Sequence, residues 1–138
     1  MESQFFDEFL TSDDTLRVYK EDGLVFSSNK DGLLPLIDYI DKFATSHKQV
    51  GIFDKIMGNA VALLSIEAGC RKVYSPIGSE LAIRTLENYG IEYHLNEVVP
   101  YIQNRSGEDM CPMEKLSIDK SPGEFYEAVR TSFTQRRE

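Results

Sequence analysis

The fold of this chain is decided by residues 49–80, which read QVGIFDKIMGNAVALLSIEAGCRKVYSPIGSE. Residues 49–53 and 72–75 are short, largely apolar runs that predict two buried strands. Between them, residues 56–68 are almost entirely apolar and end at a glycine, which is typical of a helix buried on most sides. A strand, a buried helix and a second strand in this order indicate the α/β class.

The N-terminal segment adds three further elements to this unit. Phenylalanines at helical spacing within residues 5–10 predict a short amphipathic helix. Asp22-Gly23 lies between two apolar runs, 15–20 and 24–27, and this arrangement predicts a β-hairpin. An apolar stripe over residues 33–44 then predicts a helix, with Pro35 in its first turn, where a proline is tolerated.

The C-terminal segment continues the alternation. Residues 79–89 predict a helix, and 91–95 alternate between apolar and polar types, as in a half-buried strand. Pro112 opens a short helix, and a capping box at 121–124 opens the last one. One face of that last helix carries Phe125, Val129 and Phe133. The whole order predicts a mixed sheet with helices on both faces, a three-layer α/β/α sandwich.

Size and composition restrict the class of protein. A chain of 138 residues, 41% of them hydrophobic and 28% charged, is expected to form a single globular domain over residues 1–138. No window approaches the roughly 18 apolar residues of a membrane span. The N-terminus lacks a basic segment followed by an apolar one, so we expect no export signal and a cytoplasmic protein.

The charge balance argues against nucleic-acid binding. The formal net charge is −8, with 23 acidic and 15 basic residues. Such a surface repels a phosphate backbone unless a basic stripe overrides it, and the one basic cluster, Arg136-Arg137, is followed by Glu138. A single nucleotide held by backbone amides in a pocket remains compatible with this charge.

Cysteine and histidine are scarce, which limits metal and acid–base chemistry. Cys70 and Cys111 are far apart and have no CxxC spacing, so two reduced thiols are expected. His47 and His94 are the two histidines in the chain. His94 lies on the polar phase of its strand, so we expect it to be exposed, and Cys70 follows a helix-ending glycine and is expected to be structural.

Four stretches carry a resemblance to a known family. They are Gly58-Asn59-Ala60-Val61-Ala62-Leu63-Leu64, Tyr74-Ser75-Pro76, Asn104-Arg105-Ser106-Gly107 and Met110-Cys111-Pro112-Met113-Glu114. Over nearly its whole length the chain resembles a short bacterial and archaeal family of unknown function that has a cytidine-deaminase-like fold. A hairpin followed by a β-α-β-α-β unit is the layout of that fold, and the resemblance therefore implies it.

The resemblance does not extend to the zinc motif of deaminases. A zinc deaminase has His-x-Glu or Cys-x-Glu at the start of its first buried helix and Pro-Cys-x-x-Cys at the next. This chain keeps Pro76, but Ile77 and Glu80 stand where the two cysteines would be, and no histidine lies near residue 54. Zinc needs three nitrogen or sulfur ligands there, so we expect no metal and no cofactor.

A binding pocket is expected where two helices begin, at the carboxyl ends of neighbouring strands. Free amides and helix dipoles at such a point favour an anionic or polar ligand. The side chains expected to line it are Asp54, Lys55, Asn59, Ser75, Ser79 and Glu80. An alternative is that these residues only cap the helices, as Ser, Asp and Asn commonly do.

Cys111 is the candidate nucleophile. With Pro112 at the first helical position, Cys111 becomes the N-cap, where the helix field lowers the pKa of a thiol. Arg105 is near it in sequence and could position an anion, and His94 is the candidate base. The alternative is a cysteine that packs as a small apolar group. The loop 104–109 is either a plain turn or a flap, and Tyr101 is either core or a stacking platform for a base.

These observations leave three functional hypotheses. The first is a domain without zinc that binds a small polar ligand, such as a nucleotide or ribosyl compound, by analogy of fold. The second is a cysteine-dependent enzyme that uses Cys111. The third is a regulatory or protein-interaction module. Whether the chain is an enzyme stays open, and so does a homo-oligomer, while no membrane partner is expected.

Overall fold

A five-stranded mixed sheet forms the centre of the molecule in the computed structural model, which describes residues 2–43, 46–104 and 106–137. Its order is β2-β1-β3-β4-β5. The strands are β1 (Leu16–Lys20), β2 (Gly23–Ser28), β3 (Val50–Asp54), β4 (Cys70–Ser79) and β5 (Glu92–Val99). β1 pairs antiparallel with β2 and β3, whereas β3, β4 and β5 are parallel. The predicted α/β class and mixed sheet are confirmed.

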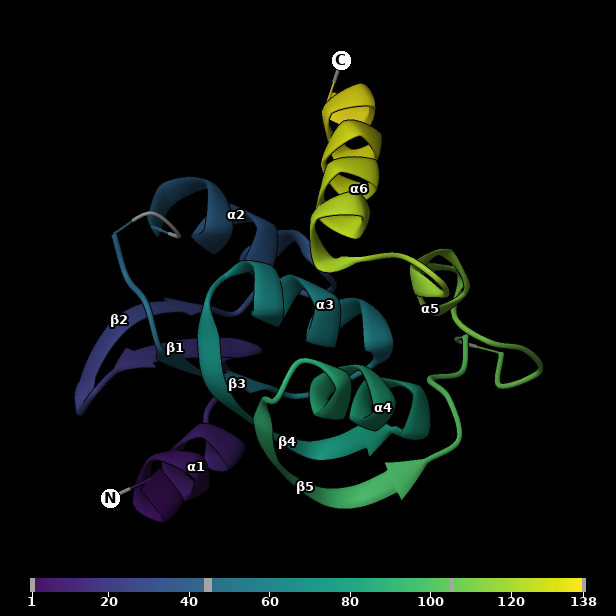
Figure 1. The fold of residues 1–138 in the computed structure, drawn as a ribbon. Coiled ribbons are helices and arrows are strands. Elements are labelled where there is room, and N and C mark those ends of the chain that lie inside the picture. The colour runs from purple at the N-terminus through teal and green to yellow at the C-terminus, as the bar shows by residue number, and fades with distance from the viewer. Residues whose placement is uncertain (1, 44–45, 105, 138) are drawn as a thin grey trace.

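Helices lie on both faces of this sheet, so it forms the middle of three layers (Figure 1). They are α1 (Glu2–Thr11), α2 (Leu34–Phe43), α3 (Asn59–Glu67), α4 (Glu80–Asn88), α5 (Pro112–Ser117) and α6 (Pro122–Arg137). Figure 1 shows α1 by itself below the sheet and α2, α3 and α6 above it. Residue 44, predicted at the end of α2, lies outside the described part of the chain.

Alternation along the strands divides the apolar side chains between two cores. Val18, Ile52 and Val73 face α2, α3, α4 and α6 in the larger core, where α3 is buried on nearly all sides. Their chain neighbours Phe53 and Tyr74 point to the other face and pack with Phe6 and Phe9 of α1. A period of two therefore sends consecutive residues to opposite layers.

Local signals explain most element ends. The predicted hairpin forms around Glu21-Asp22, where Glu21 adopts a φ of 55°. At α6, Ser121 Oγ accepts from Glu124 N, and Glu124 Oε1 accepts from Ser121 N, so the predicted capping box is confirmed. Phe125 and Val129 are buried as predicted, while the side chain of Phe133 lies outside the described residues.

The start of α3 and the end of β4 differ from the sequence prediction. The helix expected from residue 56 begins at Asn59, because Met57 instead forms a bridge with Gly78 of β4. Met57 N–H donates to Ile77 O at 2.8 Å, and Ser79 N–H donates to Met57 O at 3.0 Å. β4, expected to stop at residue 75, consequently continues to Ser79. Parallel pairing of residues 77–79 with 97–99 of β5 stabilises this extension.

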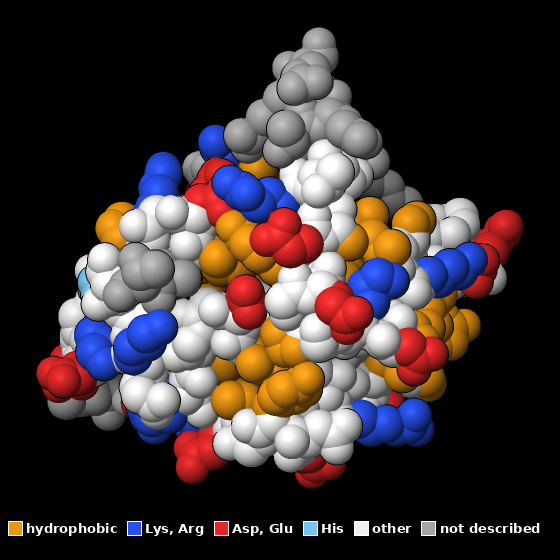
Figure 2. All heavy atoms as spheres, turned by 45° about the horizontal axis from the view of Figure 1, so that its top comes forward, with side chains coloured by type: hydrophobic (Ala, Val, Ile, Leu, Met, Phe, Trp, Pro, Cys, Tyr) orange, Lys and Arg blue, Asp and Glu red, His pale blue; other side chains and the backbone are white. Residues whose placement is uncertain are grey.

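The face drawn in Figure 2 carries both signs of charge. Figure 2 shows Lys and Arg side chains interspersed with Asp and Glu, and hydrophobic side chains gathered in small areas between them. Among the described residues, no helix combines the length and the apolar composition needed to cross a bilayer.

Candidate functional site

A cavity of about 430 Å³ opens beyond the carboxyl end of β3, beside the first turn of α3. Three sequence-predicted site residues line it, namely Asp54, Lys55 and Cys111. The other lining residues are Thr15, Asp31, Gly32, Leu33, Ile56, Gly58, Ala60, Val61, Ile102, Met113 and Glu114. Its wall is therefore mostly apolar, with a few polar groups, as is usual for small-molecule sites.

Asp54 is the most perturbed carboxyl at this cavity. It ends β3 opposite Leu16 of β1, and its Oδ1 accepts from Ile56 N–H at 3.2 Å. Loss of solvation by burial raises the pKa of Asp54 to about 7, and the hydrogen bonds from Ile56 and Lys55 N–H only partly oppose this. Near neutral pH, Asp54 can therefore either donate or accept a proton, which is the behaviour of many functional carboxyls.

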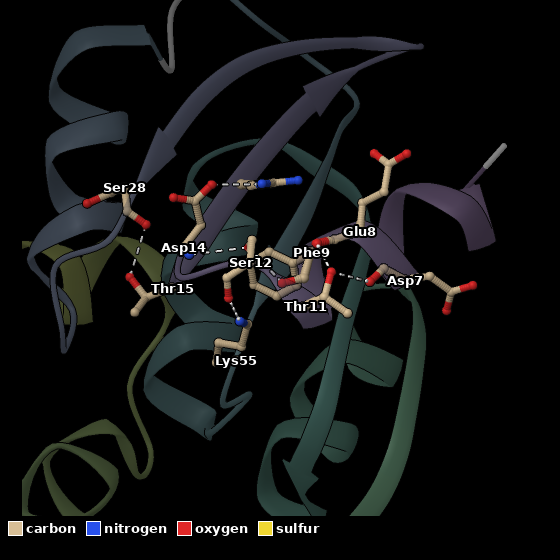
Figure 3. Close-up of polar contacts among 10 residues, drawn as sticks. Asp7, Glu8, Phe9, Thr11, Ser12, Asp14, Thr15, Ser28 and Lys55 are labelled. Atoms are coloured by element: carbon tan, nitrogen blue, oxygen red, sulfur yellow. Dashed lines mark hydrogen bonds and ion pairs between the residues drawn. The ribbon is translucent and has the colours of Figure 1, made fainter.

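The Lys55 side chain lines the cavity, and its ammonium has contacts at the end of α1. Its Nζ donates to the carbonyl of Ser12 at 2.9 Å and lies 4.6 Å from the centre of the Phe9 ring. Figure 3 shows this contact at the C-terminal end of α1, next to the Thr15 hydroxyl, which donates to Ser28 O at 3.2 Å. Lys55 therefore links the end of β3 to the C-terminal end of α1, and its ammonium already has these two partners.

Glu114 is the site residue that sequence reasoning missed. Its side chain is 2% exposed, and its two oxygens accept from two backbone N–H groups. Oε1 accepts from Asn59 N–H at 2.6 Å, and Oε2 accepts from Ile102 N–H at 3.0 Å. A carboxylate at the start of a helix is stabilised by the helix dipole. The first turn of α3, expected to offer a free anion site, therefore already holds a carboxylate of the protein.

Asn59 belongs to a buried network rather than to the cavity wall. Its Nδ2 donates to Ser117 Oγ at 2.9 Å, and its Oδ1 accepts from the Thr85 hydroxyl. Ser117 Oγ in turn donates to Glu114 O at 2.6 Å. Because both ends of the Asn59 amide have partners, this residue joins α3, α4 and α5 and has no lining role at the cavity.

Ser75, Ser79 and Glu80 are not among the residues that line the cavity. Ser79 Oγ accepts from Ala82 N–H at 3.0 Å as the N-cap of α4. Ser75 Oγ donates to Ile77 O at 2.8 Å within β4. Glu80 is exposed in the first turn of α4. The cavity is thus lined by residues at the start of α3 and by none at the start of α4, and the capping alternative describes Ser79.

Cys111 lies at the N-cap of α5, as predicted, and is half-buried at the cavity. Its backbone N–H donates to Ile102 O at 2.8 Å, which joins the start of α5 to the segment after β5. Arg105 itself lies outside the described residues. The exposed His94 packs against Phe6 on the α1 side of the sheet, with ring centres 5.4 Å apart, so it is separated from Cys111 by the sheet.

Cys70 behaves as a structural cysteine, as predicted. It is 5% exposed in the larger core, and burial raises the pKa of its thiol to about 12. Within the part of the chain that the structure describes, no three His, Cys, Asp or Glu side chains lie close enough together to hold a metal ion.

Comparison with known proteins assigns the chain to a family. The family model described as "Domain of unknown function (DUF1893)" matches residues 6–133, which is nearly the whole chain. The chain belongs to the DUF1893 family. The predicted membership of a family of unknown function is thus confirmed, and the cytidine-deaminase likeness stays a prediction.

A solved DUF1893 structure has the same fold. The crystal structure of a DUF1893 family protein from Thermotoga maritima matches with a TM-score of 0.85 at 23% sequence identity. The match covers 95% of this chain and 88% of the other. No curated protein matches the chain. At this identity the comparison supports the DUF1893 fold alone and leaves function to the geometry of the site.

Proposed function

We propose that this DUF1893 chain is a small-molecule-binding domain whose ligand occupies the cavity at the carboxyl end of β3. The observation that carries the proposal is the cavity itself, because its volume of about 430 Å³ lies within the ~300–1,000 Å³ of small-molecule sites. The carboxyl edge of the parallel strands is also where open α/β sheets bind ligands. At that edge lies the Asp54 carboxyl, whose pKa of about 7 allows it to be protonated or ionised near neutral pH.

The polar groups around the cavity indicate the charge of the ligand. Asp31, Asp54 and Glu114 contribute carboxyls to its wall, while the Lys55 ammonium is bound to Ser12. A phosphate placed there would be repelled and would find the first turn of α3 already occupied by Glu114. Among the expected ligands, an uncharged ribosyl compound therefore fits better than a nucleotide.

A second argument is the likeness of fold to cytidine deaminases. We propose that the chain is a cytidine-deaminase-like domain that lacks the zinc motif, because a hairpin and a β-α-β-α-β unit follow one another in the sheet. Ile77 and Glu80 stand at the positions of the motif's cysteines. This likeness is one of fold and does not establish a reaction.

Native mass spectrometry of the chain, incubated with a desalted bacterial metabolite extract, tests the proposal. We expect a bound small molecule on the unmodified protein and its loss in Met113→Trp, which fills the cavity. Leu116→Trp is the matched control, since Leu116 is also half-buried in α5 but does not line the cavity. If no adduct forms, or if both variants retain it, the proposed site is wrong.

A cysteine-dependent enzyme is the second candidate, because Cys111 and Asp54 line the same cavity. Iodoacetamide should then alkylate Cys111 well below pH 8, with the buried Cys70 as an unreactive internal reference. Alkylation of Cys111 only at alkaline pH would leave it as a packing residue.

A further inference from the structure

A second hollow adjoins the cavity at the carboxyl ends of β4 and β5. Its volume is about 290 Å³, and it shares Ile56 and Ile102 with the cavity. The rest of its lining consists of Ile77, Val99, Pro100, Tyr101 and Gln103. None of these side chains carries a charge, whereas the cavity next to it contains several carboxyls. The two hollows therefore offer a ligand different groups, carboxyls in the cavity and uncharged side chains in the second hollow. Ile56 and Ile102 form the wall between them.

The base of the wall between the hollows is held by hydrogen bonds of the Ile56 and Ile102 backbone, two of them to carboxyl side chains. On one side, Ile102 N–H donates to Glu114 Oε2 at 3.0 Å, and Ile102 O accepts from Cys111 N–H at 2.8 Å. On the other side, Ile56 N–H donates to Asp54 Oδ1 at 3.2 Å. The Ile56 side chain itself is 49% exposed, so the wall is fixed below and open to solvent above.

We propose that the two hollows are two subsites for one ligand, with its hydroxyl-bearing end in the cavity and an uncharged flat ring beside Tyr101 in the second hollow. This inference rests on the proposed function, because the polar end is the part that the cavity would bind. A ring without charge fits the second hollow, since its walls are uncharged and mostly apolar and the Tyr101 ring offers a surface for offset stacking.

One ligand is favoured over two because the Ile56 side chain lies exposed between the two hollows. A group that crosses the exposed Ile56 side chain covers it on both sides, and this buries apolar surface that a ligand confined to one hollow would leave in water. An anionic link would place charge near Asp31 and Asp54, so the connection between the two ends is expected to be uncharged.

Backbone amide NMR shifts with three probes test the inference. D-ribose carries the hydroxyl-bearing end alone, adenosine adds an uncharged flat ring, and AMP adds a phosphate. We expect adenosine to shift the amides of both Gly32 and Leu33 at the cavity and of Tyr101 and Gln103 at the second hollow. D-ribose should shift only the first pair, and AMP should bind more weakly than adenosine.

Paired tyrosine variants complete the test. Tyr101→Ala should weaken adenosine binding roughly three- to tenfold and leave D-ribose binding unchanged. Tyr89→Ala is the matched control, because Tyr89 is 49% exposed at the end of α4 and lines neither hollow. If adenosine shifts only the cavity amides and Tyr101→Ala has no effect, the second subsite is wrong while the proposed function stands. If no probe shifts the cavity amides, both are contradicted.

Discussion

The Glu114 side chain connects three parts of the chain at the cavity. Its carboxylate holds the first turn of α3 through Asn59 N–H and the segment after β5 through Ile102 N–H, while its own backbone lies in α5. Three separate parts of the chain thus meet at one buried side chain. The hydrogen bond between Ile102 N–H and Glu114 therefore fixes part of the cavity wall, because both residues line the cavity.

Removal of this carboxylate should destabilise the fold. Glu114→Ala leaves the buried Asn59 N–H and the part-buried Ile102 N–H without an acceptor. Each such group costs ~1–3 kcal/mol, so we expect a loss of about 2–6 kcal/mol in the free energy of unfolding. Glu114→Gln keeps one acceptor oxygen and should cost less. Urea denaturation measures both variants.

Glu124→Ala is the control for that measurement. Glu124 also accepts from a backbone N–H at a helix start, but it is exposed, so water can replace it as acceptor and its removal should cost clearly less than that of Glu114. Equal losses for Glu114→Ala and Glu124→Ala would contradict the account of Glu114.

Asp54 should make stability depend on pH with a definite sign. Burial raises its pKa in the folded state from 3.8 to about 7, so folding favours the protonated carboxyl. This contribution is complete below about pH 4 and is lost as the pH rises to about 7. Asp54→Asn cannot ionise, so its stability relative to the unmodified chain should rise across that interval and then level off.

Denaturation curves at several pH values measure this difference. Asp109→Asn provides a control of opposite sign, because the hydrogen bond from Lys115 lowers the pKa of the exposed Asp109. An Asp54→Asn difference that is flat between about pH 4 and pH 7 would show that Asp54 is solvated like an ordinary surface carboxyl.

Single-residue roles were predictable where they depend on chain neighbours. The Cys111 N-cap, the Ser121 capping box and the burial of Cys70 follow from residues within a few positions of each. Glu114 was not predictable in this way, since a glutamate in the first turn of a helix is usually exposed, and its partner Asn59 is 55 positions away.

At the scale of elements, the junction between β3 and α3 determines the shape of the cavity. A Cβ atom at Gly58 would lie 2.8 Å from Ile102 Cγ1 and 2.9 Å from Glu114 Oε1. Glycine is therefore required because the neighbouring elements leave no room for a side chain. Its φ of −82° is accessible to any residue.

Gly58→Ala should consequently destabilise the chain by about 1–3 kcal/mol, the cost of overpacking. Gly123→Ala, at the start of α6, is the matched substitution, since the nearest atom to its added Cβ would be 3.9 Å away. Alanine favours a helix over glycine, so this second change should be neutral or stabilising. Thermal melting temperatures compare the two variants. An unchanged melting temperature for Gly58→Ala would contradict the close contact at Gly58.

Element boundaries were less predictable than element types. Hydrophobic spacing correctly indicates α1, the β1–β2 hairpin, α2 and α6, because it reflects which face is buried. It misplaces the start of α3 and the end of β4, since the bridge between Met57 and Gly78 joins two segments that are distant in sequence. The same long-range contact engages backbone groups of residues 57 and 77–79 just before the two helix starts that we had expected to share a pocket.

At the scale of the whole molecule, the described helices are divided unequally between the two faces of the sheet. One face of the sheet is covered by α1 and the other by α2, α3, α4 and α6 (Figure 1). The cavity opens at the carboxyl edge of the sheet near α3. The α/β class and the mixed sheet follow from sequence alone. The position and lining of the cavity do not, because Asp31, Ile102 and Glu114 come together only through folding.

The central claim is that a carboxylate of the protein occupies the first turn of α3, so the cavity beside it serves an uncharged ligand. Hydrogen exchange of the Asn59 amide, measured by NMR as inorganic phosphate is added, tests this most directly. We predict a slowly exchanging amide whose shift and exchange rate do not respond to phosphate, since Glu114 Oε1 accepts its proton. A rapidly exchanging Asn59 amide that moves with added phosphate would contradict the claim.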